Sequence, residues 1–132
     1  MPTSLPSAAK DLLDGPTYVT LSTISPDGCP HSTVLWVKRD GDDVLMSTTI
    51  GRVKERHLRR DPRVTVSFFD PANPYTYFTV TGRAELTAEN GFALIDELSH
   101  KYAGQPYTAD EGTDNVRVIV RVTPDRVYPS GG

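Results

Sequence analysis

Hydroxyl side chains followed at once by basic ones form the part of this sequence best suited to chemistry. Segment 47–49 reads Ser-Thr-Thr, and Arg52 and Lys54 follow within five positions. Hydroxyl and cationic donors this close together suit a phosphate, and a guanidinium can contact two phosphate oxygens at once. If the hydroxyls end a strand and the cations begin a helix, free backbone N–H groups and the helix dipole add to this preference. The pattern indicates a site for a small anion.

The basic residues are concentrated in one segment of an acidic chain. Residues 52–63 hold six Lys or Arg against two acidic residues, whereas the 132 residues together carry a formal net charge of -3. The rest of the chain therefore carries -7. A nucleic-acid binder spreads positive charge over a whole face, so a small anionic partner is favoured over a nucleic-acid-binding module. A solvated basic helix without any ligand explains the charge about as well.

Other chemistries find less support. The three histidines (positions 31, 57 and 100) lack metal-ligand spacing, and the single cysteine, Cys29, excludes an internal disulfide framework and a multi-cysteine metal site. Neither a Walker loop nor a G-x-S-x-G elbow occurs. We therefore predict no metal and name no catalytic acid or base. Because no signal segment or apolar run of membrane length is found, we expect a cytoplasmic protein with no membrane partner.

The elements that must position these residues follow from hydrophobic periodicity. Strands are expected at 17–24, 32–37, 44–49, 63–69, 75–86 and 116–122, and helices at 8–14, 51–61 and 88–102. Six strands with hairpin-length early connections indicate a single domain over residues 1–132, mainly β (α+β). We expect a closed or nearly closed antiparallel barrel with short helices outside it.

The basic helix should be amphipathic. Ile50, Val53, His57 and Leu58 recur at helical spacing, so we expect them to face the barrel and the basic side chains to face outwards. Elsewhere, Trp36 is expected in the core, and the aromatic group around Tyr77 is expected to pack in the core or in a dimer.

The order of these features resembles the pyridoxamine 5'-phosphate oxidase-like split β-barrel proteins, which bind flavins. The resemblance rests on segments 25–32, 46–49, 58–64 and 80–85, together with Arg52 and Lys54. Within that superfamily the chain is most similar to small actinobacterial proteins that use the deazaflavin coenzyme F420, through segments 95–107 and 122–128. The resemblance covers nearly all of residues 8 to 128 and implies a six-stranded antiparallel split β-barrel.

The resemblance also implies a cofactor site between the two subunits of a homodimer. It puts the flavin-like ring, largely through backbone groups, against Ser32, Thr33, Val34 and Leu35. It puts the phosphate against Ser47, Thr48, Thr49, Arg52 and Lys54. Tyr77 matches a position that reaches the cofactor from the second subunit, and Arg56 and Arg60 have room to meet an acidic tail.

The function implied is that of a coenzyme F420-dependent oxidoreductase. It would pass hydride from the reduced deazaflavin to a small unsaturated or electrophilic organic substrate. An FMN-binding oxidoreductase of the same family and a non-catalytic flavin or deazaflavin carrier are the alternatives. Ser32 stands where the FMN enzymes have a basic residue, which favours the deazaflavin.

Overall fold

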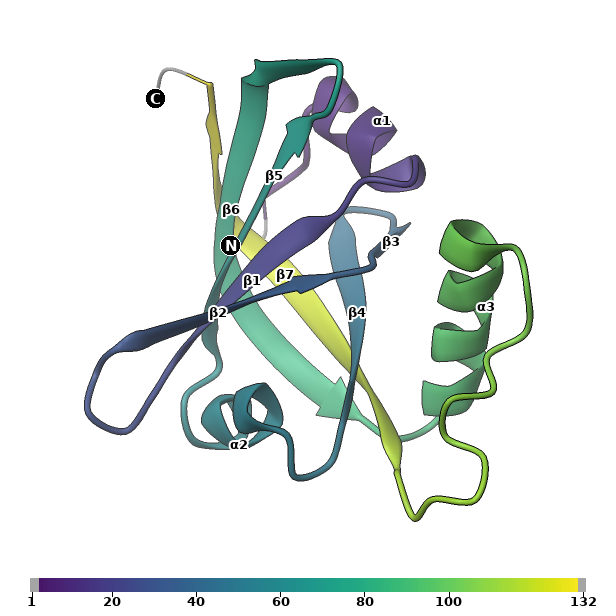
Figure 1. The fold of residues 1–132 in the computed structure, drawn as a ribbon. Helices are drawn as coiled ribbons and strands as arrows, with labels where there is room; N and C mark the ends of the chain where they lie inside the picture. The colour runs from purple at the N-terminus through teal and green to yellow at the C-terminus, as the bar shows by residue number, and fades with distance from the viewer. Residues whose placement is uncertain (1–2, 131–132) are drawn as a thin grey trace.

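An antiparallel sheet curled on itself forms the body of the protein (Figure 1). The computed structural model describes residues 3–130, and within them lie seven strands and three helices. In chain order these are α1 (Ser7–Asp14), β1 (Val19–Ile24), β2 (Pro30–Leu35), β3 (Lys38–Asp40), β4 (Asp43–Thr49), α2 (Val53–Arg60), β5 (Arg63–Asp70), β6 (Asn73–Thr87), α3 (Gly91–Ala103) and β7 (Arg117–Pro129). The mainly β fold expected from the sequence is confirmed.

The strand order is β2-β1-β5-β6-β7-β4-β3, so β2 and β3 are the two edges of the sheet. All of its strand pairs are antiparallel, and no pairing joins β2 to β3 within the described residues. The sheet is therefore split rather than closed. The expected count of six strands is wrong by one. The chain leaves β2 at Leu35. The additional strand, β3, pairs with β4 over only three residues, which are too few to show an alternation of apolar and polar side chains.

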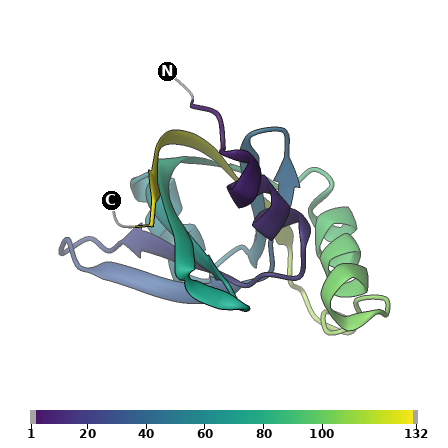
Figure 2. The same cartoon turned by 90° about the horizontal axis from the view of Figure 1, so that it is seen from above.

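One face of the sheet forms the main core. Alternating residues of the strands are buried there, among them Val19 and Leu21 of β1 and Val120 and Val122 of β7. From the end of the curled sheet (Figure 2), α1 adds Leu13 to the same core. A core enclosed in this way holds the strands on both sides of the split in fixed positions.

The helix α3 lies outside the sheet beside β4 and β7 (Figures 1 and 2). Leu94 and Leu98 pack with Leu45 in a second apolar cluster. At the first residue of α3, the backbone meets β7 closely: a Cβ atom on Gly91 would lie 2.1 Å from the carbonyl oxygen of Arg117. A glycine is therefore required where the helix crosses the strand.

The helix α2 begins two residues later than expected and buries a different face. Ile50 and Val53 are 48% and 39% exposed, so the expectation that they face the barrel is wrong. Gly51 has φ +94°, which turns the chain before the helix starts. Glu55 is buried instead, and its Oε1 accepts the Gly51 N–H at 2.8 Å. The burial of His57 and Leu58 is confirmed.

Over residues 3–130, none of the helices has both the length and the apolar character needed to cross a membrane.

Candidate functional site

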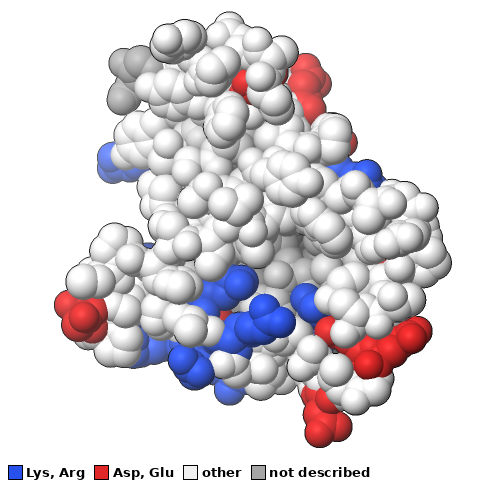
Figure 3. Space-filling view, viewed as in Figure 1, with Lys and Arg blue, Asp and Glu red and all other residues white. Residues whose placement is uncertain are grey.

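A hollow of about 250 Å³ opens in the split of the sheet, between β2 and β4. Its walls come from both sides of the split, from α3 and from the start of α2: Tyr18, Val34, Leu35, Trp36, Ser47, Thr48, Arg52, Lys54, Ile95, Leu98 and Arg117. Figure 3 shows Lys and Arg side chains gathered below a hollow in the middle of this face. The hollow therefore has a cationic end and an apolar wall.

Three cations converge at the polar end. Arg52 precedes the first residue of α2, Lys54 lies in its first turn, and Arg117 is the first residue of β7, which pairs with β4. Burial lowers the pKa of Lys54, and the nearby Arg52 and Arg117 guanidiniums lower it further. An anion between these groups would relieve their mutual repulsion.

A residue with a buried hydroxyl also lines the hollow. Thr48 is 2% exposed, and among the described residues its Oγ1 has no hydrogen-bond partner. An unpaired buried hydroxyl costs about 1–3 kcal/mol, and a ligand oxygen would offset this cost. The donor set of one hydroxyl and three cations therefore fits a phosphate group.

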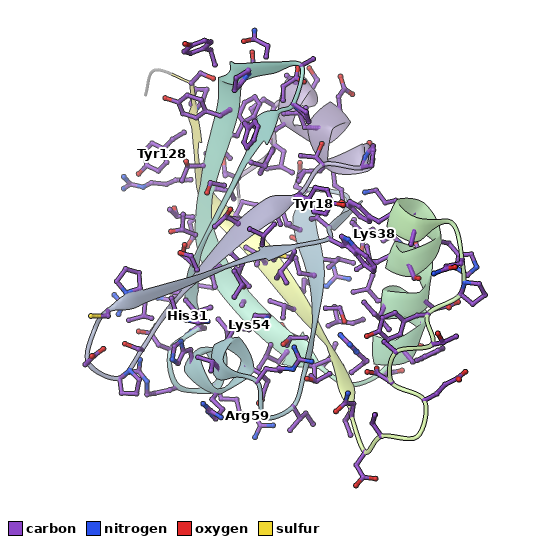
Figure 4. All side chains as sticks on the ribbon, in the orientation of Figure 1. Tyr18, His31, Lys38, Lys54, Arg59 and Tyr128 are labelled. Carbon is purple, nitrogen blue, oxygen red and sulfur yellow. The ribbon has the colours of Figure 1, made fainter. Side chains whose placement is uncertain are left out.

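The opposite wall of the hollow is aromatic. The ring of Trp36 stacks on Tyr102 with 5.4 Å between centroids and 6° between planes, and Tyr18 packs against Tyr102 at 5.4 Å. The Tyr102 hydroxyl donates to the Thr17 carbonyl at 2.6 Å and accepts the Val37 N–H at 3.1 Å. Figure 4 shows Tyr18 near the start of β1 and Lys54 near α2. This fixed cluster gives the hollow a wall suited to a flat ring.

Strand β2 borders the hollow with backbone groups as well as side chains. It pairs with β1 along one edge and forms the end of the described sheet along the other. An edge strand presents unpaired N–H and C=O groups. A flat ligand with in-plane donors and acceptors could pair with such an edge.

Half of the residues expected to hold a cofactor line the hollow: Val34, Leu35, Ser47, Thr48, Arg52 and Lys54. Ser32, Thr33, Thr49, Arg56, Arg60 and Tyr77 lie outside its lining. The Ser32 hydroxyl bonds with that of Ser22 at 2.8 Å. A role in binding remains a prediction for all twelve residues.

The two outer arginines of α2 have partners within the chain. Arg56 donates to the Gly51 carbonyl at 2.8 Å, and Arg60 donates to the Ile24 carbonyl at 2.7 Å. Both residues are exposed, so these hydrogen bonds leave their side chains accessible to a ligand that extends beyond the hollow.

Sequence reasoning missed Arg117, Tyr18, Ile95 and Leu98 as parts of this hollow, and it expected Trp36 in the core. Trp36 is half-buried and forms part of the wall. For Arg117 the only signal was its place at the start of an alternating strand. That place did not distinguish it from Arg121, four residues along, which pairs with Asp40 and Asp43 instead.

The fold and this site together define a split-barrel protein with a cationic hollow at the split. The family model described as pyridoxamine 5'-phosphate oxidase matches residues 5–131. The chain belongs to the pyridoxamine 5'-phosphate oxidase family.

Individual proteins of known sequence or structure agree with this. A pyridoxine/pyridoxamine 5'-phosphate oxidase of Vibrio vulnificus is 33% identical over 87 residues, which are 64% of this chain and 40% of that protein. The solved structure of an F420 reductase has a TM-score of 0.83 and 32% identity, covering 94% of this chain and 98% of the other. A conserved hypothetical protein of Mycobacterium tuberculosis has a TM-score of 0.78 and 27% identity, covering 98% and 86%. The matched region is thus less than half of the curated oxidase but almost all of the reductase.

Proposed function

We propose that this protein is a coenzyme F420-dependent reductase that acts on a small unsaturated or electrophilic organic substrate. The observation that carries the proposal is a hollow at the open edge of β2 where cations converge beside Thr48, whose buried hydroxyl has no partner within residues 3–130. The likeness to an F420 reductase over almost the full length of both chains supports the choice of cofactor.

Arg52, Lys54 and Thr48 bind the phosphate of the cofactor in this proposal. The free edge of β2 at Val34 and Leu35 receives the ring. When bound, the reduced deazaflavin supplies a hydride. The residues of this chain orient the ring, and the apolar wall excludes water from it.

The positive surface of α2 supports a cofactor with an acidic tail. Arg56 and Arg60 lie on the exposed part of this helix, beyond the cationic end of the hollow. Glutamate carboxylates leaving the phosphate site in that direction would meet positive charge. Since the chain outside segment 52–63 carries -7, a long nucleic acid would be repelled instead.

FMN is the second candidate cofactor, and a specific observation favours it. The curated relatives are pyridoxine/pyridoxamine 5'-phosphate oxidases, and the same cation and hydroxyl cluster would accept the phosphate of FMN. A carrier that binds either cofactor without turning it over is the non-catalytic alternative.

A homodimer completes the proposal. A second hollow of about 340 Å³ is lined by aromatic residues that include Tyr18, Phe69 and Tyr77, which are 56%, 52% and 42% exposed. Tyr18 also lines the first hollow, so the two adjoin. Apolar surface of this kind is typical of an interface. A second subunit placed there would lie next to the cofactor.

Turnover tests the proposal directly. Purified protein is mixed with reduced coenzyme F420 and a panel of activated enones, and the return of the oxidised deazaflavin absorbance is followed. Oxidation that depends on both protein and enone is expected. Tight binding of the deazaflavin with no turnover on any enone would favour the carrier.

A further inference from the structure

We propose that Arg117 is a third cationic ligand of the phosphate, beside Arg52 and Lys54, and that Asp110 and Tyr107 are the residues that position it. This inference rests on the proposed function, because it deepens the same anion site. It assigns a binding role to the loop between α3 and β7, residues 104–116, here called the strap.

The guanidinium of Arg117 is held on two sides. Its Nε donates to Asp110 Oδ2 at 2.8 Å and one NH2 hydrogen reaches Asp110 Oδ1 at 3.3 Å, which makes a forked pair. NH2 also bonds to the Tyr107 hydroxyl, and the Tyr107 ring lies 4.9 Å from the guanidinium carbon. The side chain is only 12% exposed. Its orientation is therefore fixed before any ligand arrives.

The remaining nitrogen points to the hollow. Among the described residues, NH1 forms a single hydrogen bond, to Ser47 Oγ, and its length of 3.5 Å is at the limit for such a bond. Ser47 itself lines the hollow. Arg117 therefore keeps donor capacity toward the hollow that Arg52 and Lys54 also line.

The residues that hold Arg117 are themselves anchored. Asp110 accepts the Asn115 side-chain amide at 2.9 Å, and its carbonyl accepts the Thr113 hydroxyl at 2.6 Å. The backbone N–H of Tyr107 donates to Asp96 of α3 at 2.9 Å. The strap is thus a small hydrogen-bonded structure built around one guanidinium.

The charge of Asp110 explains why three cations can stand together. The negative charge of its carboxylate offsets the charge of Arg117 and leaves NH1 available. Repulsion from Arg52 and Lys54 therefore does not displace the guanidinium. The pKa of Asp110 is lowered, first by its hydrogen bond to Arg117, and Arg52 lowers it further. The proximity of Arg52 indicates that the strap and the start of α2 border one site.

A matched pair of variants tests this inference. Arg117→Ala and Arg121→Ala each remove an arginine of β7 that pairs with aspartate, but only Arg117 lines the hollow. Each variant is titrated, by fluorescence, with coenzyme F420 and with its phosphate-free core, the deazaflavin ring with its ribityl chain. We expect Arg117→Ala to weaken binding of the full cofactor about tenfold or more and of the core less than twofold. Arg121→Ala should change neither.

Tyr107→Phe tests the positioning role without changing any charge. It removes the hydroxyl contact to Arg117 and keeps the ring, so a loss of several-fold is expected for the full cofactor alone. This variant also keeps the test decisive if Arg117→Ala does not fold, as judged by circular dichroism. An equal loss for both ligands, or none for the full cofactor, would overturn the inference.

The failures of the inference and of the proposed function are distinguishable. If the wild-type protein does not prefer the phosphate-bearing cofactor over the core, the proposed anion site itself is wrong. If the wild-type protein shows that preference and Arg117→Ala keeps it, only the role of Arg117 and the strap is wrong.

Discussion

Lys54 carries its charge in an unfavourable place. Its ammonium is half-buried, and two guanidiniums, those of Arg52 and Arg117, act on it. Such an arrangement makes the binding of an anion more favourable, because the ligand removes a repulsion that the folded chain already contains. The charges at this site therefore favour an anionic ligand over a neutral one.

Removing either of the two cations predicted from the sequence should weaken cofactor binding. We expect Arg52→Ala or Lys54→Ala to cost about 1.5–3 kcal/mol, or about tenfold or more in Kd, as for one charge-assisted contact. Fluorescence titration with coenzyme F420 measures this. Arg63→Ala is the matched control, since Arg63 is exposed and pairs with Asp61 away from the hollow. Unchanged affinity in both test variants would contradict the phosphate assignment.

The affinity should also depend on pH through Lys54. Its pKa in the free protein lies below the ordinary 10.5, and a bound anion raises it again because it stabilises the charged form. Binding therefore takes up a proton once the pH passes the lowered pKa, and affinity should fall as pH rises through that range. In Lys54→Arg the decline should be absent, since arginine stays charged. Titrations from pH 7 to pH 10 compare the two; identical slopes would count against the argument.

The sequence predicted those site residues that lie close together along the chain. Thr48, Arg52 and Lys54 stand within seven positions, so their pattern was readable before folding. Arg117 comes into the site only because β7 pairs with β4, with Thr49 opposite Arg117. That register is set by the packing of the whole sheet, and no local spacing reveals it.

Among the elements, α2 depends on its contact with β1. The Nδ1 of His57 and the Oγ1 of Thr23 lie 2.9 Å apart in a buried pair, and the edge of the His31 ring meets the His57 ring. The buried imidazole of His57 therefore fixes the helix to the sheet.

This contact should make stability depend on pH. Burial, with smaller contributions from His31, Arg60 and Arg56, lowers the pKa of His57 below 6.5. The unfolded chain then binds the proton more readily, so the contribution of His57 to stability is fully present above about pH 6.5 and is lost as the pH falls through its lowered pKa. Urea unfolding between pH 5 and pH 8 measures the trend. His57→Gln should flatten it; an equally steep trend in this variant would exclude His57 as its source.

The same elements show what periodicity can and cannot predict. Period-two alternation located the long strands, since each buries one face in the main core. The buried face of α2 was mispredicted at Ile50 and Val53, because the left-handed turn at Gly51 delays the helix. Glu55 then fills the buried position with a carboxylate that holds the Gly51 N–H and pairs with Arg59. Hydrophobicity alone does not predict such a position.

The exposed aromatic residues that line the second hollow, Tyr18, Phe69 and Tyr77, are the main feature of the whole molecule that packing of the core does not explain. We expect a dimer in sedimentation at micromolar concentration and a monomer after Phe69→Asp, because a charge would be buried at the interface. Phe92→Asp is the control: Phe92 is similarly exposed, at 56% against 52%, but lies on α3 outside the second hollow. A wild-type monomer with cofactor still bound would contradict the shared site.

The proposed function requires that the split of this sheet bind a deazaflavin by its phosphate. Titration of the purified protein with coenzyme F420 and, in parallel, with FMN tests it most directly, with fluorescence as the readout. We predict saturable binding of coenzyme F420 that is tighter than that of FMN and is weakened by Arg52→Ala. Tighter binding of FMN, or no saturable change with coenzyme F420, would contradict the account.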